Sequence, residues 1–248
     1  MATPSERTWA ARLALALVVA LGSPSAARAD WILSGFLGAA KTQSSTIDLS
    51  LPAQGTHLQL EGAEYRGESF QSPQYYGVRL TRTVGPWLGI EGEFIHAKVF
   101  AEVDRDVRAT GTRHGAPLSA DVRLSSVVQR LSMSHGLNFI LVNVAARHGI
   151  GPTDSRGAHR IVGVVRAGAG PTMPHAESHI DNVTMEQYEG GGLGVQLGGG
   201  IELSLGHGVG ALGEYKFTDA SPEIDVPGGT ATIPSRTHHV VFGVVVRF

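Results

Sequence analysis

The chain has 248 residues with 33 glycines, no cysteine and 6% aromatic residues. The formal net charge of −2 at pH 7 argues against a nucleic-acid-binding protein, which needs a basic surface. Without cysteine there is no disulfide scaffold, so stability must come from backbone pairing and packing. A mean hydropathy of +0.02 together with many glycines is typical of strands and tight turns that divide apolar from polar surroundings.

The N-terminus predicts an export signal. Arg7 and Arg12 precede an apolar run over 13–21, and an A-x-A cleavage site follows. The chain therefore divides into a signal peptide, 1–29, and one mature domain, 30–248. The apolar run is too short for a transmembrane helix, which takes about 20 residues.

Eight segments with alternating side-chain character predict eight strands, because successive side chains of a strand point to opposite faces. The predicted strands are 31–42, 75–84, 87–103, 137–148, 160–170, 188–204, 209–218 and 237–248. Glycine and proline at 85–86, and two glycines in 206–208, predict tight turns, and a further turn is expected at 149–157. We expect long polar loops over 43–72, 104–135, 171–186 and 219–236, the second of them with an extended piece at 120–131.

The last strand shows the alternation most clearly. Val240, Phe242 and Val244 lie on an apolar face that ends at the terminal Phe248, whereas the opposite face includes Arg247. This segment resembles the closing strand of bacterial outer-membrane barrels. The resemblance implies an all-β fold, an eight-stranded antiparallel transmembrane β-barrel in the bacterial outer membrane, and insertion by the barrel assembly machinery. The alternation of long loops and short turns fits if both termini lie in the periplasm.

The polar faces of the predicted strands carry both signs of charge. An eight-stranded barrel has room inside for side chains and little else. We therefore expect opposite charges to pair in the interior, for example Arg79 with Glu91, which argues against a pore. The charged residues assigned to this structural role are Arg79, Glu91, Glu93, Arg147, Arg166, Glu202, Glu214 and Lys216.

Polar residues on the predicted lipid-facing side are the candidate site. His96 and Lys98 share the outward parity of Phe94. A strand crosses the apolar core in roughly 9–11 residues, so both side chains reach the outer headgroup level. They either extend to headgroups from the barrel surface or form a site that faces lipopolysaccharide. Asn138, on the next strand, lies near the same rim.

His175, Glu177 and His179 are spaced by two, so an extended chain places them on one side. Two imidazoles and a carboxylate can hold a divalent metal with open positions, as in non-heme iron oxygenases. We take His96, His175 and Glu177 as candidate ligands of an iron-type ion and as candidate catalytic residues. The alternative is a solvated loop, and His114, His135 and His148 are interpreted as loop or rim histidines.

Five stretches, in order along the mature chain, resemble the rhizobial-type lipid A oxidase family of outer-membrane barrels. They are Gly67-Glu68-Ser69-Phe70 with Pro73 and Tyr75-Tyr76-Gly77; Phe94 with His96 and Lys98-Val99-Phe100-Ala101; Gly136-Leu137-Asn138; Gly168-Ala169-Gly170 with Pro174-His175 and Glu177; and Glu214-Tyr215-Lys216. The resemblance implies an oxidoreductase that converts the proximal glucosamine of lipid A to 2-aminogluconate with oxygen. Lys98 and Arg66 would pair with lipid A phosphate, and Asn138 and Tyr76 are further candidate substrate-binding residues.

Two other functions stay open. The chain is alternatively a non-catalytic structural or adhesive barrel, in which the rim histidines and lysine only anchor headgroups. A lipid A deacylase ranks lower, because the His-x-Ser-Asn pattern of that barrel family is absent. In each case we expect a monomer whose partner is lipopolysaccharide.

Overall fold

The computed structural model describes residues 31–153 and 158–248. The predicted signal peptide, 1–29, lies outside the described residues. Within the described ranges no helix is both long enough and apolar enough to cross a membrane.

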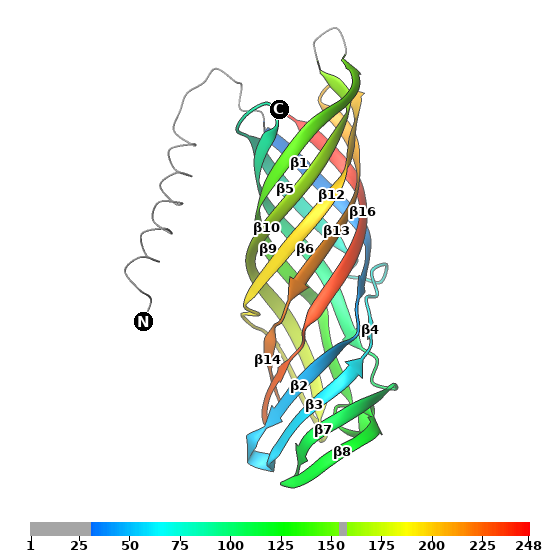
Figure 1. The fold of residues 1–248 in the computed structure, drawn as a ribbon, viewed down its shortest axis with the longest axis vertical. Coiled ribbons are helices and arrows are strands. Elements are labelled where there is room, and N and C mark those ends of the chain that lie inside the picture. Colours follow the sequence, from blue (N-terminus) through cyan, green and yellow to red (C-terminus); the bar gives the residue numbers. More distant parts are fainter. Residues whose placement is uncertain (1–30, 154–157) are drawn as a thin grey trace, which may run out of the picture.

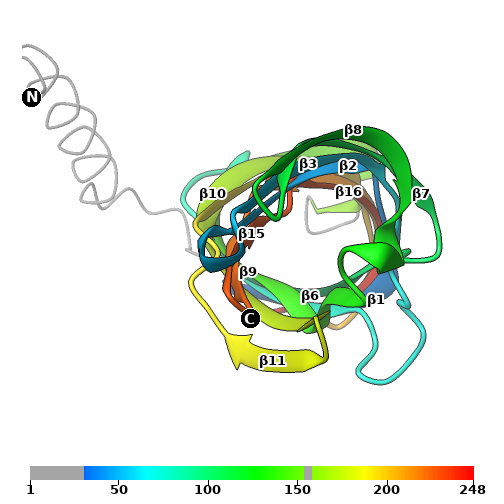
Figure 2. The same cartoon turned by 90° about the horizontal axis from the view of Figure 1, so that it is seen from below.

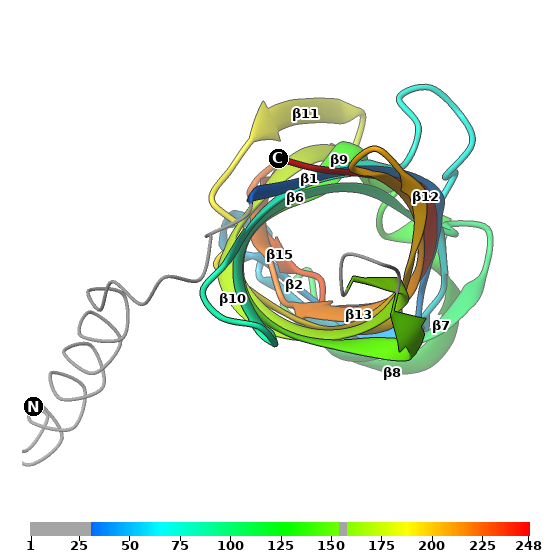
Figure 3. The ribbon, with the colours of Figure 1, turned by 90° about the horizontal axis from the view of Figure 1, so that it is seen from above.

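Eight long strands form a closed antiparallel barrel, as predicted (Figure 1). Around the ring they are β1 (Trp31–Thr42), β5 (Tyr76–Thr83), β6 (Leu88–Ala101), β9 (Arg130–Thr153), β10 (His159–Ile180), β12 (Leu193–Gly206), β13 (Val209–Ala220) and β16 (Ser235–Arg247). Each strand pairs with the next one in this order, and β16 pairs with β1, which closes the ring seen in Figures 2 and 3.

The outer face of the barrel is apolar. In β16, Phe242 and Val244 are 66% and 59% exposed, whereas Val241 and Val245 point inward and are fully buried. The same alternation exposes Leu33 and Leu37 on β1. Closure leaves the barrel wall without a free edge, and an apolar belt on a closed barrel is accommodated by lipid. The protein is a transmembrane barrel of the bacterial outer membrane.

The two ends of the barrel differ. The connections 84–87 and 207–208 are short and lie at the end that holds the C-terminus (Figure 1). Trp31 and Phe248 exchange backbone hydrogen bonds of 2.9 Å at this same end. Outer-membrane barrels keep their short turns in the periplasm, so the opposite end is the outer one.

At the outer end the prediction of long polar loops is wrong. The segments pair into hairpins that form a second, six-stranded sheet: β2 (Ser45–Leu51) with β3 (Thr56–Ala63), β7 (Asp106–Arg113) with β8 (Ala116–Arg123), and β14 (Glu223–Val226) with β15 (Gly229–Thr232). Ile47, Leu49 and Leu51 alternate with polar residues and are buried. This alternation indicates a strand, but the largely polar composition of the segment led to the prediction of a loop. Two 3-10 turns, Pro52–Gln54 and Leu124–Ser126, complete this part.

β9 and β10 are longer than predicted. β10 continues through the expected loop to Ile180, and its outer end pairs with β11 (Val183–Tyr188). A two-residue strand, β4 (Tyr65–Arg66), pairs with the end of β6. Two segments stand outside the ring in Figures 2 and 3: β11, in yellow, and the connection 67–75, in cyan. They flank the wall made by β6 and β9.

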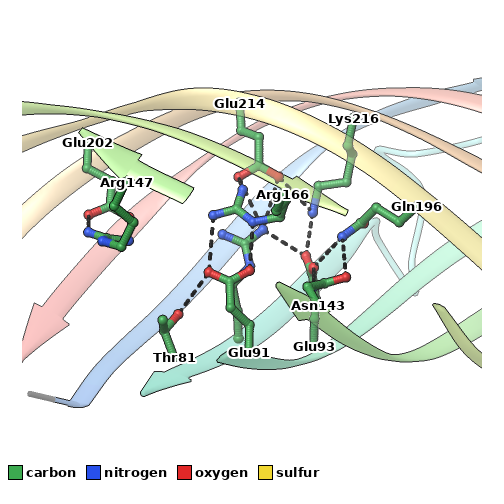
Figure 4. A network of polar contacts seen from close by, with 11 residues as sticks. Thr81, Glu91, Glu93, Asn143, Arg147, Arg166, Gln196, Glu202, Glu214 and Lys216 are labelled. Carbon is green, nitrogen blue, oxygen red and sulfur yellow. Dashed lines mark hydrogen bonds and ion pairs between the residues drawn. The ribbon is translucent and has the colours of Figure 1, made fainter. Parts of the chain in front are cut away.

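The interior is filled by ion pairs, as expected (Figure 4). Arg79 bonds Glu93 at 2.8 Å and Glu214 at 3.0 Å, and its contact with the predicted partner Glu91 is longer, 3.6 Å. Lys216 bonds Glu93, and Arg166 bonds Glu91 at 2.7 Å. Arg147 and Arg247 share Glu202 at 2.7 and 2.6 Å. The buried network fills the interior with paired charged side chains.

Candidate functional site on the outer wall

A cavity of about 570 Å³ lies on the outside of the wall, and Tyr188 of β11 and Pro73 of the connection 67–75 both line it. We call it the wall groove, and it is lined by Pro73, Tyr76, Phe94, His96, His135, Asn138, Met173 and Tyr188. A second cavity of about 450 Å³, the rim pocket, lies beside it and shares Pro73 and His135 with it. The charged residues of the rim pocket are Arg66, Glu68, Lys98, Arg130 and Glu177.

The groove is built around a bulge in β9. Leu137 pairs with Ala97 on β6 and with Pro174 on β10, while Met133 pairs with Val99 and Ala176. Residues 134–136 of β9 therefore lie opposite one residue on each neighbouring strand, Lys98 and His175. A bulge of this kind bends the strand and changes where its side chains point. It brings His135 to the surface between the two cavities.

Gly136 makes the bulge possible. Its φ of +102° is one that side-chain-bearing residues rarely adopt. A Cβ at this position would lie 2.5 Å from His96 Nδ1 and 2.8 Å from Asn138 Oδ1. The backbone therefore approaches two groove residues more closely than any side chain allows, and glycine is required on both counts.

His96 is held in one orientation. Its ring stacks on Tyr76 at a centroid distance of 5.0 Å, and Nδ1 donates to Asn138 Oδ1 at 2.9 Å. Asn138 Nδ2 in turn donates to the Met173 carbonyl at 3.0 Å, which fixes the amide with its oxygen toward the imidazole. Since Nδ1 carries the proton, neutral His96 keeps a lone pair on Nε2. In the described part of the chain Nε2 has no hydrogen-bond partner.

The prediction that His96 and Lys98 face lipid directly is wrong, because each is only 4% exposed. The connection 67–75 covers Lys98, whose Nζ donates to the Gln71 carbonyl at 3.1 Å. Glu68 lies 3.9 Å from the same Nζ. Arg66 stacks on Phe100, with its guanidinium carbon 5.1 Å from the ring centroid, and bonds Glu68 at 2.9 Å.

The structure does not bring the three predicted metal ligands together. Glu177 pairs with Arg130 at 2.8 Å in the rim pocket, and His96 is bound to Asn138. His175 instead meets two residues that the sequence did not single out for this role, His135 and Glu186. Within the described ranges, these three form the one group of potential ligands whose ligand atoms all lie within 4.8 Å of one another.

No protein-family model and no curated protein sequence matches the chain. Among solved structures it is similar to Neisserial surface protein A, at 9% identity and a TM-score of 0.44 over 88% of this chain and 97% of that one. The outer membrane protein OprG from Pseudomonas aeruginosa is 11% identical, with a TM-score of 0.42 over 89% and 96%. Ail, the attachment invasion locus protein of Yersinia pestis, is 9% identical, with a TM-score of 0.38 over 90% and 100%. The closed barrel is established by its own strand pairing, and these likenesses concern the fold alone.

Fold and site together define a membrane barrel whose interior holds buried ion pairs and whose wall carries, on its outside, a largely apolar groove with three polar side chains, His96, His135 and Asn138.

Proposed function

We propose that the protein binds lipid A in the wall groove and oxidises its proximal glucosamine to 2-aminogluconate. The observation that carries this proposal is the position of the groove. It lies on the outside of the barrel, lined by His96 from the outer part of β6 and Asn138 from the outer part of β9, where an outer-leaflet lipid can enter sideways.

The two cavities suit the two parts of such a lipid. Phe94, Met173 and Tyr76 give the wall groove an apolar and aromatic lining. The adjoining rim pocket carries Lys98 and Arg130, which can make charge-assisted bonds to phosphate. Lys98 has the weaker carboxylate pairing of the two, because its bonded partner is a carbonyl and its nearest carboxylate is 3.9 Å away, whereas Arg130 bonds Glu177 at 2.8 Å.

The proposed reaction is a two-electron oxidation at the anomeric carbon of a sugar with a free anomeric hydroxyl. The C–H bond supplies two electrons and a proton, the hydroxyl supplies a second proton, and oxygen is reduced to hydrogen peroxide. The resulting lactone adds water and opens to the carboxylate. His96 is the residue we assign to the hydroxyl proton, because its orientation is held through Nδ1 while Nε2 is free to accept.

Mass spectrometry of lipid A from aerated cells with and without the gene tests this proposal. The expected product has gained one oxygen atom, and that oxygen comes from water, so growth under ¹⁸O₂ leaves the product unlabelled. His96→Gln should abolish the product while the folded, heat-modifiable band persists on gels. An unchanged lipid A mass under aeration refutes the oxidase, and loss of an acyl chain indicates a deacylase instead.

A non-catalytic surface barrel is the second candidate. The observation in its favour is the six-stranded sheet that extends the wall beyond the groove at the outer end (Figure 1). Such a sheet offers a broad surface for adhesion or for support of the cell envelope. Unchanged lipid A, together with a loss of surface attachment when β7 and β8 are replaced by a short turn, favours this role.

A further inference from the structure

We infer that His135, His175 and Glu186 bind one divalent transition-metal ion beside the wall groove. The inference deepens the proposed oxidation, since it adds a redox-capable centre next to the sugar. Binding of the ion does not itself depend on lipid A, so the two ideas can fail separately.

The three side chains already converge. All their ligand atoms lie within 4.8 Å of one another, and the rings of His135 and His175 are 4.6 Å apart between centroids. His175 Nε2 lies 3.5 Å from Glu186 Oε1, too far for a strong hydrogen bond. Two ligands that are each about 2.0–2.2 Å from an ion lie roughly 3–3.5 Å apart, so this spacing suits a shared ion.

Three different strands supply the ligands, so the cluster is set by backbone pairing. His135 comes from the β9 bulge, and His175 is the single β10 residue opposite that bulge. On the other side of β10, Tyr188 of β11 pairs with His175, and Glu186 lies two residues further along the same face of β11. Rigid strands hold such a site with less motion than a loop does.

The surroundings favour metal binding over an ordinary ion pair. The His135 Nδ1 lies 3.3 Å from the Ser134 hydroxyl, a contact that leaves Nε2 for the ion and orients the ring. His175 is buried among aromatic neighbours, with Tyr188 4.3 Å away, and its Nδ1 has no hydrogen-bond partner in the part of the chain that the structure describes. An imidazole with no other bonded partner is available as a ligand.

The ligand types define the class of ion. Two imidazoles and one carboxylate suit Fe²⁺, Co²⁺ or Zn²⁺, whereas Mg²⁺ and Ca²⁺ prefer all-oxygen sites. Three protein ligands leave coordination positions open, the arrangement seen in catalytic sites. His135 and Tyr188 line the wall groove together with His96, so the open side faces the cavity that holds the residue assigned to the sugar hydroxyl proton. An iron-type ion there would supply the electron transfer to oxygen that the side chains cannot perform.

Titration of the folded full-length barrel in detergent with CoCl₂, without lipid A, tests the inference. We expect one saturable Co²⁺ per chain with visible d–d absorption. His135→Gln, His175→Gln and Glu186→Gln should each weaken binding by at least about 100-fold, at or above the upper end of the 10–100-fold loss seen when supporting residues are removed. His179→Gln is the matched control, because this β10 histidine bonds Thr184 of β11 and lies outside the cluster.

Absence of saturable binding, or binding that survives all three substitutions, overturns the inference. A second measurement needs no variant: Co²⁺ should protect His135 of the wild-type barrel from diethylpyrocarbonate and leave His179 as reactive as before, and equal reactivity with and without Co²⁺ also overturns it. Co²⁺ binding with unmodified lipid A in cells refutes the oxidase alone. Modified lipid A without Co²⁺ binding refutes the metal site alone.

Discussion

Replacing Gly136 with alanine tests the geometry of the groove most directly. The new Cβ would need a φ of +102° and would lie 2.5 Å from His96 Nδ1. Left-handed strain costs about 1–3 kcal/mol, and loss of the bond from His96 to Asn138 adds about 0.5–1.5 kcal/mol. We therefore expect the free energy of unfolding to fall by roughly 1.5–4.5 kcal/mol, with His96 displaced from Tyr76.

Gly151→Ala is the matched control. Gly151 lies on the same strand with a positive φ of +78°, but nothing lies within 4 Å of the added Cβ. This variant should show the cost of the left-handed backbone strain alone, about 1–3 kcal/mol. The assay is urea unfolding of the barrel in lipid vesicles, followed by the gel mobility of the folded form. Equal stability of the two alanine variants, with lipid A modification unchanged in Gly136→Ala, would refute the close approach on which the groove depends.

Three further predictions address the interior, the lipid face and the rim pocket. Glu93→Ala should lower the free energy of unfolding in urea by about 3–5 kcal/mol, because it leaves the buried Lys216 without its nearest carboxylate; a change below 1 kcal/mol would contradict the buried network. Phe242→Arg should destabilise the barrel in vesicles by about 2–4 kcal/mol if this exposed position lies near the bilayer midplane, and wild-type stability would show that the position does not face lipid. Lys98→Gln should lower the retention, on the purified barrel, of phosphorylated lipid A that has a free anomeric hydroxyl, measured by mass spectrometry of the co-purified lipid. Arg130→Gln should lower this retention less, because Arg130 already pairs with Glu177. Equal retention in the wild type and both variants would exclude the rim pocket as the phosphate site.

The barrel was predictable because lipid and lumen impose a two-residue period on every spanning strand. The faces of β16 follow from parity alone, and so does the inward direction of Arg79 and Lys216. The hairpins at the outer end were missed because their buried residues, such as Ile47 and Leu49, sit in segments of largely polar composition.

The candidate site was only partly predictable. The sequence indicated that His96, Lys98, Asn138 and His175 gather near the rim, and the structure places them on neighbouring strands around the bulge. It gave no reason to join His135 with Glu186, which are 51 positions apart by numbering. The two meet because β11 folds back along β10. The residue pattern of a single strand does not show which other strand it pairs with.

The amino-acid sequence by itself determined an all-β chain, eight spanning strands and an interior of paired charges, since each of these depends on which of two faces a residue occupies. Only the tertiary structure decided the groove and the cluster of His135, His175 and Glu186. Three β9 residues there lie opposite one residue on each neighbour, so the local register departs from the two-residue period. Where that period breaks, the direction of a side chain is set by the strands on either side and no longer by its place in the sequence.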